Sequence, residues 1–556
     1  MTALNKFFKF VLDSLKRLGN FVYNSLKNFF VYLFMIPVRI YRYIRYVYAD
    51  VKENPKAFRV ALRSFFIMGL GQFKNKQKYK GVPFLVIGLL FLIVEIASSS
   101  YWFAPGELFG SYPIIEGEKF YFFRDYGGFF TSSLWGFFTL GRLVIGDTYR
   151  GEAIKLFDKV ITWKSADNSI VLLGEGILAL ILIIALIIIW VLQIRDAYET
   201  AKEIKKTKEV ETFQEFKKRM FDDFFAYIII IPAAVLILFI TLVPFLFSFL
   251  IAFTNFTSKI NIGGTLIKWV GFSNFGTYLF QREGLDFFFK VFTWTVVYAV
   301  MASITVYLIG FIQALIVESK YVKHKKIWRI FMILPWAIPA MISLMMFKNV
   351  FSDNGGLANE LLINFGVLDQ AKAFLASIGL LGQTHEGVIL WYSDPLNGPL
   401  AKAIILLVNM WLGSPYFMLL IVGVLGTIPA TLYEAAEIDG ASATQKFRFI
   451  TFPWVLRATI PVIITTFTFN FNNFGAIYFL TGGGPGFPID QIPEKMRVTG
   501  ATPGQSDILI SWIYKIAFSN DPERYNLASV YSILIFLVVG LFAIYNLSKV
   551  KSFWED

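Results

Sequence analysis

Residues 433–453 of this 556-residue chain read YEAAEIDGASATQKFRFITFP. The stretch is polar and compatible with helix, and it joins two apolar runs that are each long enough to cross a bilayer. Glu434 would fall near a helix start, where its carboxylate suits the helix dipole. Gly440 can adopt the backbone angles that end a helical turn. On spacing alone, the alternative is an ordinary amphipathic connector between membrane helices.

The composition places the chain in a membrane. Hydrophobic residues make up 56% of it and charged residues only 16%, against roughly 25% charged residues in soluble domains. The chain has no Cys, which excludes disulfides, thiolate metal sites and thiol catalysis, and its two His cannot form a histidine cluster. We therefore expect an all-α polytopic membrane protein without a metal site.

Eight segments are apolar over about 20 residues, the length that crosses the hydrocarbon core. The expected spans are residues 82–102, 176–194, 226–252, 291–318, 329–350, 402–426, 457–480 and 526–549. Residues 319–329 hold five basic residues and no acid, whereas residues 351–400 hold five acids and one Lys. The positive-inside rule then puts both termini and residues 433–453 in the cytoplasm. Residues 253–290 fit this topology poorly, because they should lie outside but carry four basic and two acidic residues.

Three regions differ in charge and hydropathy. Residues 1–81 hold 16 Lys and Arg against three Asp and Glu, and they lack the features of a signal peptide. We predict a basic cytoplasmic region with an amphipathic helix at the membrane surface, in contact with anionic lipid. Residues 82–225 should form two peripheral spans with an external loop and a charged cytoplasmic linker. Residues 226–556 should form a core of six spans that contains residues 433–453.

The spacing of Glu434-Ala-Ala, Gly440, Ile450 and Pro453 resembles the EAA loop of binding-protein-dependent ABC importer permeases, with Phe452 where that family usually has Leu. From Tyr227 onward the chain also resembles the larger, MalF-like permease subunit of maltose-type ABC importers. The motifs that carry this resemblance are LPWAIP (334–339), NMWLGSPY (409–416), FNFNNF (469–474), LTGGGP (480–485) and TPGQSDI (502–508). The long periplasmic domain that enterobacterial forms carry after their third span is missing.

The resemblance implies a type I ABC importer permease fold and import of maltose or maltodextrin by alternating access. The implied partners are a second, MalG-like permease subunit, a homodimeric ABC ATPase and an extracellular sugar-binding protein. The residues implied in coupling to the ATPase are Glu434, Ala435, Ala436, Asp439 and Gly440. The chain has no phosphate-binding loop with its Lys, so we expect no enzyme activity and no cofactor on it, with ATP-Mg on the ATPase subunit. The expected location is the cytoplasmic membrane of a bacterium.

Asn470 and Asn473 are three residues apart in the seventh expected span, so they would share a helix face. Because an unpaired amide is costly in a membrane, the pair either holds helices together or binds sugar hydroxyls. The resemblance favours sugar binding, since matching positions in maltose-type permeases contact the transported sugar. The other residues that it implies at the sugar are Thr466, Phe469, Asn409, Leu412, Gly413 and Tyr416. Pro415 is expected to break the sixth span beside this cavity.

Glu95 lies near the middle of the first expected span, and an intramembrane acid is a candidate functional site. One rival hypothesis is therefore a secondary transporter driven by protons through Glu95. The structural alternative is a buried pair or a hydrogen bond to Ser98 or Ser99. A rival within the same class is a permease for another oligosaccharide or a polyol. Gly482–Gly484 are expected to form a flexible external loop.

Overall fold

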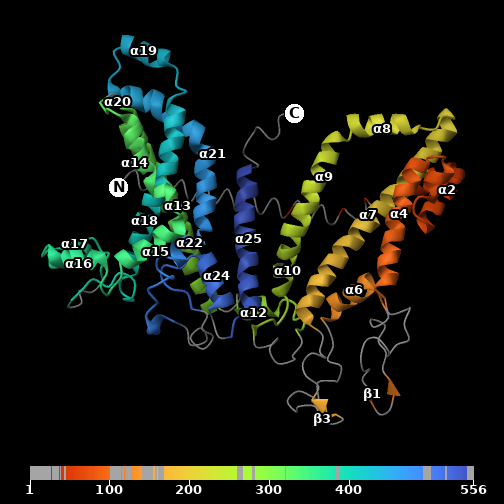
Figure 1. Ribbon diagram of the computed structural model, residues 1–556, viewed down its shortest axis with the longest axis horizontal. Coiled ribbons are helices and arrows are strands. Elements are labelled where there is room, and N and C mark those ends of the chain that lie inside the picture. Colours follow the sequence, from red (N-terminus) through yellow and green to blue (C-terminus); the bar gives the residue numbers. More distant parts are fainter. Residues whose placement is uncertain are drawn as a thin grey trace. The chain divides into compact units, whose positions relative to one another are not determined.

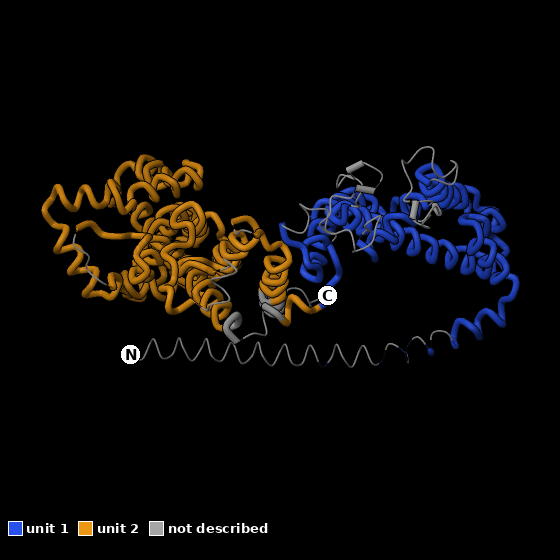
Figure 2. Tube along the Cα trace, turned by 90° about the horizontal axis from the view of Figure 1, so that it is seen from below, with its two compact units in different colours: residues 1–271, 540–556 blue, residues 272–539 orange. Residues whose placement is uncertain are grey.

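The structure is a computed structural model. It describes residues 45–99, 127–140, 168–258, 267–278, 282–319, 321–382, 387–492, 502–519 and 522–547, together with four two-residue strands and six isolated positions between residues 27 and 42. The chain forms two compact units (Figure 2). Unit 1 comprises residues 1–271 and 540–556, and unit 2 comprises residues 272–539. Most of residues 1–44 and of the external segment 103–175 lie outside the described residues, as do the predictions made for them.

Unit 1 is a set of helices around one long helix, α7 (Figure 1). Its helices are α2 (Pro55–Phe66), α3 (Leu70–Lys74), α4 (Lys78–Ala97), α6 (Phe129–Thr139), α7 (Ser169–Thr207), α8 (Phe213–Asp222), α9 (Phe225–Ile237) and α10 (Val243–Ile251), with a π-helical turn at Leu238–Leu242. Two antiparallel strand pairs lie in the segments between these helices: β1 (Ile114–Ile115) with β2 (Glu118–Lys119), and β3 (Lys155–Leu156) with β4 (Lys159–Val160). α2 and α6 both pack on α7.

Unit 2 is built on α13, which packs along α18 and α21. Its helices are α12 (Ser273–Tyr278), α13 (Arg282–Glu318), α14 (Lys325–Ala337), α15 (Ala340–Val350), α16 (Leu357–Asn364), α17 (Leu368–Ser377), α18 (Gly398–Leu425), α19 (Ala430–Ile438), α20 (Ala443–Lys446), α21 (Phe452–Phe471), α22 (Phe474–Tyr478), α24 (Leu509–Phe518) and α25 (Tyr525–Leu547). A π-helical turn at Phe447–Thr451 joins α20 to α21, and a 3₁₀ turn covers Ile489–Gln491.

The expectation of an all-α polytopic membrane protein is confirmed. Among the described residues, six helices are long and apolar enough to cross a membrane: Lys78–Ala97, Ser169–Thr207, Phe225–Ile251, Asp286–Glu318, Gly398–Leu425 and Ala443–Phe471. α14 and α15 form a seventh span only if they are counted together, because they meet at an angle of 85°. α25 coincides with the eighth expected span, and its residues Tyr525–Leu537 form a shorter apolar helix.

Two expected spans differ from the structure. The span over residues 329–350 is not one helix, because Pro339 has no amide hydrogen and disfavours helical angles at Ile338, which is extended. The span over residues 457–480 is also wrong at its end, since α21 stops at Phe471 and a separate short helix, α22, follows. The membrane orientation and the three-region division remain predictions.

The core of unit 2 depends on close approach of α13 and α18. A Cβ on Gly310 would lie 2.7 Å from the Ser414 carbonyl oxygen, and a Cβ on Gly413 would lie 2.9 Å from the Val306 side chain. Small residues of this kind let membrane helices approach closely. Two buried clusters lie along these helices, one around Tyr298, Ile405 and Ile477 and the other around Phe311, Met418 and Val455.

Candidate functional site

The loop at residues 433–453 folds as two short helices, α19 and α20, at one end of unit 2 (Figure 1). Gly440 ends α19 in the left-handed conformation, with φ of 73°. The Gly440 amide donates to the Glu437 carbonyl (3.0 Å), and the Ala441 amide donates to the Ala436 carbonyl (2.8 Å). This pair of bonds is a Schellman motif, as expected for this glycine.

α20 starts with a capping box at Ser442 and Gln445. Each half of the box is a hydrogen bond, from the Ser442 amide to Gln445 Oε1 (2.7 Å) and from the Gln445 amide to Ser442 Oγ (3.4 Å). A bond between the Tyr433 and Thr451 hydroxyls (2.8 Å) ties α19 to the segment before α21. The loop is therefore a pair of short helices joined by a defined turn, rather than an unstructured connector.

One detail of the predicted loop is wrong. Glu434 does not lie at a helix start, because α19 begins at Ala430 and Glu434 stands in its middle. Most of the loop is exposed on this chain, including Ile438, which is 87% exposed. A large apolar side chain in water at the end of a rigid helix pair is typical of a surface that another protein covers.

The two amides of the seventh span do not share a helix face, contrary to the expectation. Asn470 lies in the last turn of α21, 2% exposed, and its Nδ2 donates to Ser303 Oγ on α13 (3.1 Å). Asn473 lies beyond the end of α21 and caps α22, since its Oδ1 accepts from the Ala476 amide (3.2 Å). A capping amide must leave the preceding helix, because the cap position has non-helical angles.

Of the residues expected on α18, Asn409 contacts this region. Asn473 Nδ2 donates to Asn409 Oδ1 (3.3 Å), which brings α18 to the start of α22. The Tyr298 hydroxyl is buried near Asn473 and has no hydrogen bond of ordinary length within the part of the chain that is described. Three helices and the start of a fourth therefore share a largely buried polar site made of Ser303, Asn409, Asn470, Asn473 and Tyr298.

The remaining predicted sugar residues lie around this site in different settings. Tyr416 and Phe469 are exposed, at 39% and 67%, so both rings are open on this chain. Leu412 packs against the core, and Gly413 faces the Val306 side chain rather than an open space. Thr466 Oγ1 donates to the Val462 carbonyl of its own helix (2.8 Å).

The prediction that Pro415 breaks the sixth span is wrong. α18 continues through it from Gly398 to Leu425. Trp336, which the sequence reasoning left out, lies 5.7 Å from Tyr416 between ring centroids and is 54% exposed. Neither Ser303 nor Tyr298 could be assigned from the chain alone, because their link to the amides depends on how α13 packs.

Glu95 has a structural partner that the sequence did not indicate. Its carboxylate accepts from the amides of Gly128 (3.0 Å), Phe130 (2.8 Å) and Thr131 (3.3 Å) at the start of α6. Ser98 Oγ accepts from the Phe129 amide (2.7 Å) in the same place. Glu95 thus supplies, from another helix, the capping acceptor that α6 lacks.

The expected flexible loop at Gly482–Gly484 is instead packed. Gly483 is buried, with φ of 82°, and a Cβ there would lie 2.0 Å from Asp507 Oδ1. Asp507 is itself buried and binds Lys515 (2.6 Å) and the Gly504 amide (2.6 Å). The glycine is needed because this ion pair occupies the space of a side chain.

Comparison with known proteins places this architecture in a family. Residues 306–550 match the family model described as binding-protein-dependent transport system inner membrane component. The chain is 33% identical to the galactooligosaccharides transport system permease protein GanP of Bacillus subtilis (strain 168) over 498 residues, which cover 90% of this chain and 99% of that protein. It is 32% identical to the maltodextrin transport system permease protein MalC of Streptococcus pneumoniae over 502 residues, which cover 90% and 98% of the two chains.

Among solved structures, a crystal structure of a bacterial ABC transporter involved in the import of the acidic polysaccharide alginate matches with a TM-score of 0.43 and 19% identity, covering 60% of this chain and 99% of that one. The relatives that match over nearly their whole length establish the assignment. This chain belongs to the family of binding-protein-dependent transport system inner membrane components.

Proposed function

We propose that this chain is one of two permease subunits of an ATP-driven importer that carries maltodextrin across the cytoplasmic membrane of a bacterium. The observation that carries the proposal is the buried site where Asn409, Asn470 and Asn473 converge from two helices and the start of a third. Amides offer both donors and acceptors, which suits sugar hydroxyls. The exposed rings of Tyr416 and Phe469 would supply apolar faces for a pyranose.

The exposed helix pair α19–α20 would dock on a separate ATPase subunit, with Glu434, Ala435, Ala436, Asp439 and Gly440 in the contact. ATP binding would then move the loop, and the attached helices α18 and α21 would open and close the amide site. A second permease subunit would cover the open side of that site. An extracellular binding protein would deliver the sugar.

The names of two relatives suggest a second candidate substrate. The relative of 33% identity is named for galactooligosaccharides, whereas the relative of 32% identity is named for maltodextrin. Both names describe oligosaccharide permeases, so galactooligosaccharide is the second candidate. A transporter driven by protons through Glu95 is not favoured, because the three backbone donors around that carboxylate give it a structural role.

The test is uptake of labelled maltotriose and of a labelled galactooligosaccharide in cells that carry wild type or Asn470→Ala plus Asn473→Ala. We expect wild type to import maltotriose and the double variant to lose uptake while binding-protein-stimulated ATPase activity remains. Asn472→Ala is the matched control. Among the described residues, the side chain of this exposed neighbouring amide donates only to the Thr468 carbonyl at the end of its own helix (3.4 Å). Normal uptake by the double variant would make the amides helix contacts only. Uptake of galactooligosaccharide alone would select the second candidate.

A further inference from the structure

Helix α2 in unit 1 has three distinct faces. Ala57, Ala61 and Ser64 are buried, and they form the face that packs on α7. At 100° per residue, the next face round the helix consists of apolar side chains that are all exposed: Phe58 (42%), Leu62 (42%), Phe65 (47%) and Phe66 (75%). The third face consists of exposed cations only: Lys56, Arg59 and Arg63. α2 therefore shows an apolar stripe beside a basic stripe, and both stripes are exposed except where the Phe65 ring contacts Trp190 of α7.

The contacts of α2 fix its direction along α7. Near its start, Lys205 Nζ donates to Asn54 Oδ1 (3.1 Å). At its end, the Phe65 ring stacks on Trp190 at 5.1 Å between centroids, and Gln193 Nε2 donates to the Ser64 carbonyl (2.7 Å). α2 thus runs antiparallel to α7, and its C-terminal end lies where the apolar part of α7 gives way to Arg195 and Asp196. From hydropathy and charge, we expect α7 to leave the membrane at that boundary.

The turn after α2 holds this arrangement rigidly. The Gly71 amide donates to Ser64 Oγ (2.9 Å), and a Cβ on Gly71 would lie 2.8 Å from the Ala197 Cβ. Asn75 Nδ2 donates to the Ala197 carbonyl (2.9 Å). The angle between α2 and α7 is therefore set by buried contacts, and the exposed stripes keep one orientation relative to α7.

Most of the basic side chains around this turn have no carboxylate partner. Residues 45–80 contain nine Lys and Arg but only two acids, Asp50 and Glu53. Asp50 already binds Lys202 (2.7 Å). Within the part of the chain that the structure describes, no carboxylate lies within ion-pair distance of six exposed cations, namely Lys56, Arg59, Arg63, Lys74, Lys76 and Lys78.

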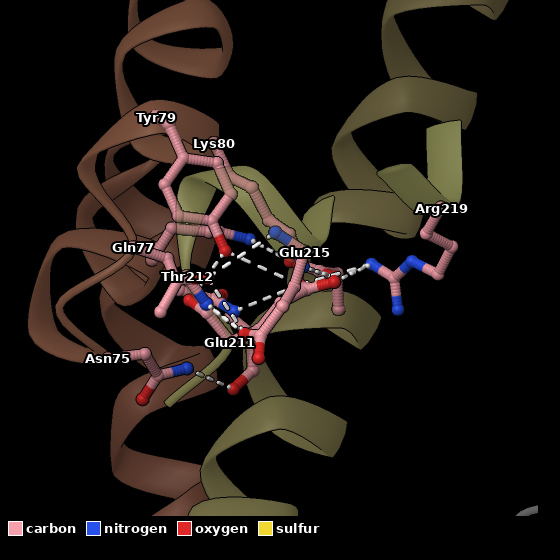
Figure 3. Close-up of polar contacts among 11 residues, drawn as sticks. Asn75, Gln77, Tyr79, Lys80, Glu211, Thr212, Glu215 and Arg219 are labelled. Carbon is pink, nitrogen blue, oxygen red and sulfur yellow. Dashed lines mark hydrogen bonds and ion pairs between the residues drawn. The ribbon is translucent and has the colours of Figure 1, made fainter. Parts of the chain in front are cut away.

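Two acids near the turn, one on α7 and one in the linker before α8, are paired with Lys80 and Arg219. Lys80 binds Asp196 (3.1 Å) and Glu211 (3.2 Å), and Arg219 also binds Glu211 (2.8 Å). Figure 3 shows Tyr79, Lys80 and Arg219 converging on Glu211. These acids are therefore not free to pair with the six exposed cations, which remain a local excess of positive charge.

We propose that α2 and the turn that follows it bind the anionic phospholipids of the adjacent membrane leaflet. Apolar side chains beside a row of cations are the surface that an interfacial helix presents to acyl chains and headgroups. Each Lys or Arg near an anionic surface adds attraction, and an uncovered row of them favours anionic over zwitterionic lipid. The first span begins at Lys78 directly after the turn, so the surface is continuous with a helix that enters the bilayer. This site is separate from the amide site and does not depend on the substrate.

The first test measures depth with spin labels. The chain has no Cys, so a single Cys introduced for a nitroxide label is the only one in this subunit. Phe58→Cys, Leu62→Cys and Phe66→Cys are labelled in the full chain, assembled with its partner subunits in bilayers. We expect the label at position 66 to be more accessible to oxygen than to a water-soluble nickel reagent, and the ratio of oxygen to nickel accessibility to fall from position 66 to position 58. Arg59→Cys should show the reverse preference. Labels shielded from both reagents would mean that a protein covers α2, which would overturn the proposal.

The second test measures lipid selectivity, as the association of spin-labelled phosphatidylglycerol relative to phosphatidylcholine. Arg59→Gln plus Arg63→Gln should lower this ratio by up to about fivefold for each cation removed. Arg59→Lys plus Arg63→Lys is the matched control, because it changes the same two side chains and keeps both positive charges on the same face. An equal fall in both double variants, or no fall in either, would overturn the proposal.

Discussion

The link between Glu95 and α6 makes a prediction that also tests the proton-driven rival. Replacing Glu95 by Ala removes the acceptor for the amides of Gly128, Phe130 and Thr131. Losing a capping side chain costs about 0.5–2 kcal/mol. Because three donors lose one charged acceptor together, we expect a value of about 2 kcal/mol for the local opening of α6. At 1.4 kcal/mol per factor of ten, amide exchange in the first turn of α6 should accelerate by about thirtyfold.

The assay is hydrogen–deuterium exchange of the peptide that covers α6, in the full chain. Glu95→Gln keeps one acceptor oxygen and should give a smaller acceleration than Glu95→Ala. Glu175→Ala is the control, since Glu175 is an exposed acid of the same unit with no described partner, and its loss should leave α6 unchanged. Unchanged exchange in Glu95→Ala would refute the capping role. Loss of uptake in Glu95→Gln with normal α6 exchange would instead favour proton transfer.

Three further predictions concern the coupling loop, the packed glycine and acid sensitivity. Gly440→Ala forces an L residue into the left-handed conformation and should destabilise the loop by about 1 kcal/mol. The expected readout is reduced sugar-stimulated ATPase activity of the complex. Gly423→Ala is the control and should behave as wild type, because Gly423 lies in α18 with open space around it. Gly483→Ala would place a methyl group 2.0 Å from a buried carboxylate oxygen. It should destabilise the fold by about 2–4 kcal/mol and lower the melting temperature. Gly486→Ala should leave the melting temperature unchanged, because a Cβ there meets nothing within 4 Å. A lysine hydrogen bond lowers the pKa of Asp50 below its ordinary 3.8. Its stabilisation is therefore present above that pH and is lost as the pH falls through the lowered pKa. Amide exchange in the segment just before α2, where the Asn54 amide donates to the Asp50 carbonyl, should therefore rise on acidification, and Asp50→Asn should remove this pH dependence.

Local features of this fold could be predicted because they depend on short stretches of chain. The length of each apolar run determines where a helix can cross the bilayer, and the positions of most spans follow from it. Gly440 ends α19 as expected, since only glycine adopts the left-handed conformation without strain. The motif spacing at residues 433–453 likewise identified the family that the comparisons then established.

The sequence-based predictions failed where the position of a residue depends on a partner that is distant in the sequence. Asn473 leaves α21 because its side chain caps α22 and bonds Asn409, 64 residues earlier in the chain. The Glu95 carboxylate accepts hydrogen bonds from backbone amides that lie more than 30 residues later in the chain. Pro339 does break a span, while Pro415 does not. The cost of a missing amide hydrogen depends on what packs around it, and a short sequence window does not contain that information.

The sequence by itself determined that this protein lies in a membrane, where most of its spans fall and which loop resembles a coupling loop. These properties follow from hydropathy, charge and short-range spacing, which are additive along the chain. Only the tertiary structure decided that Ser303 joins the amide site, that Glu95 caps α6 and that α2 turns a basic face outward beside α7. Buried polar groups must find partners wherever packing places them, and those partners are far apart in the sequence.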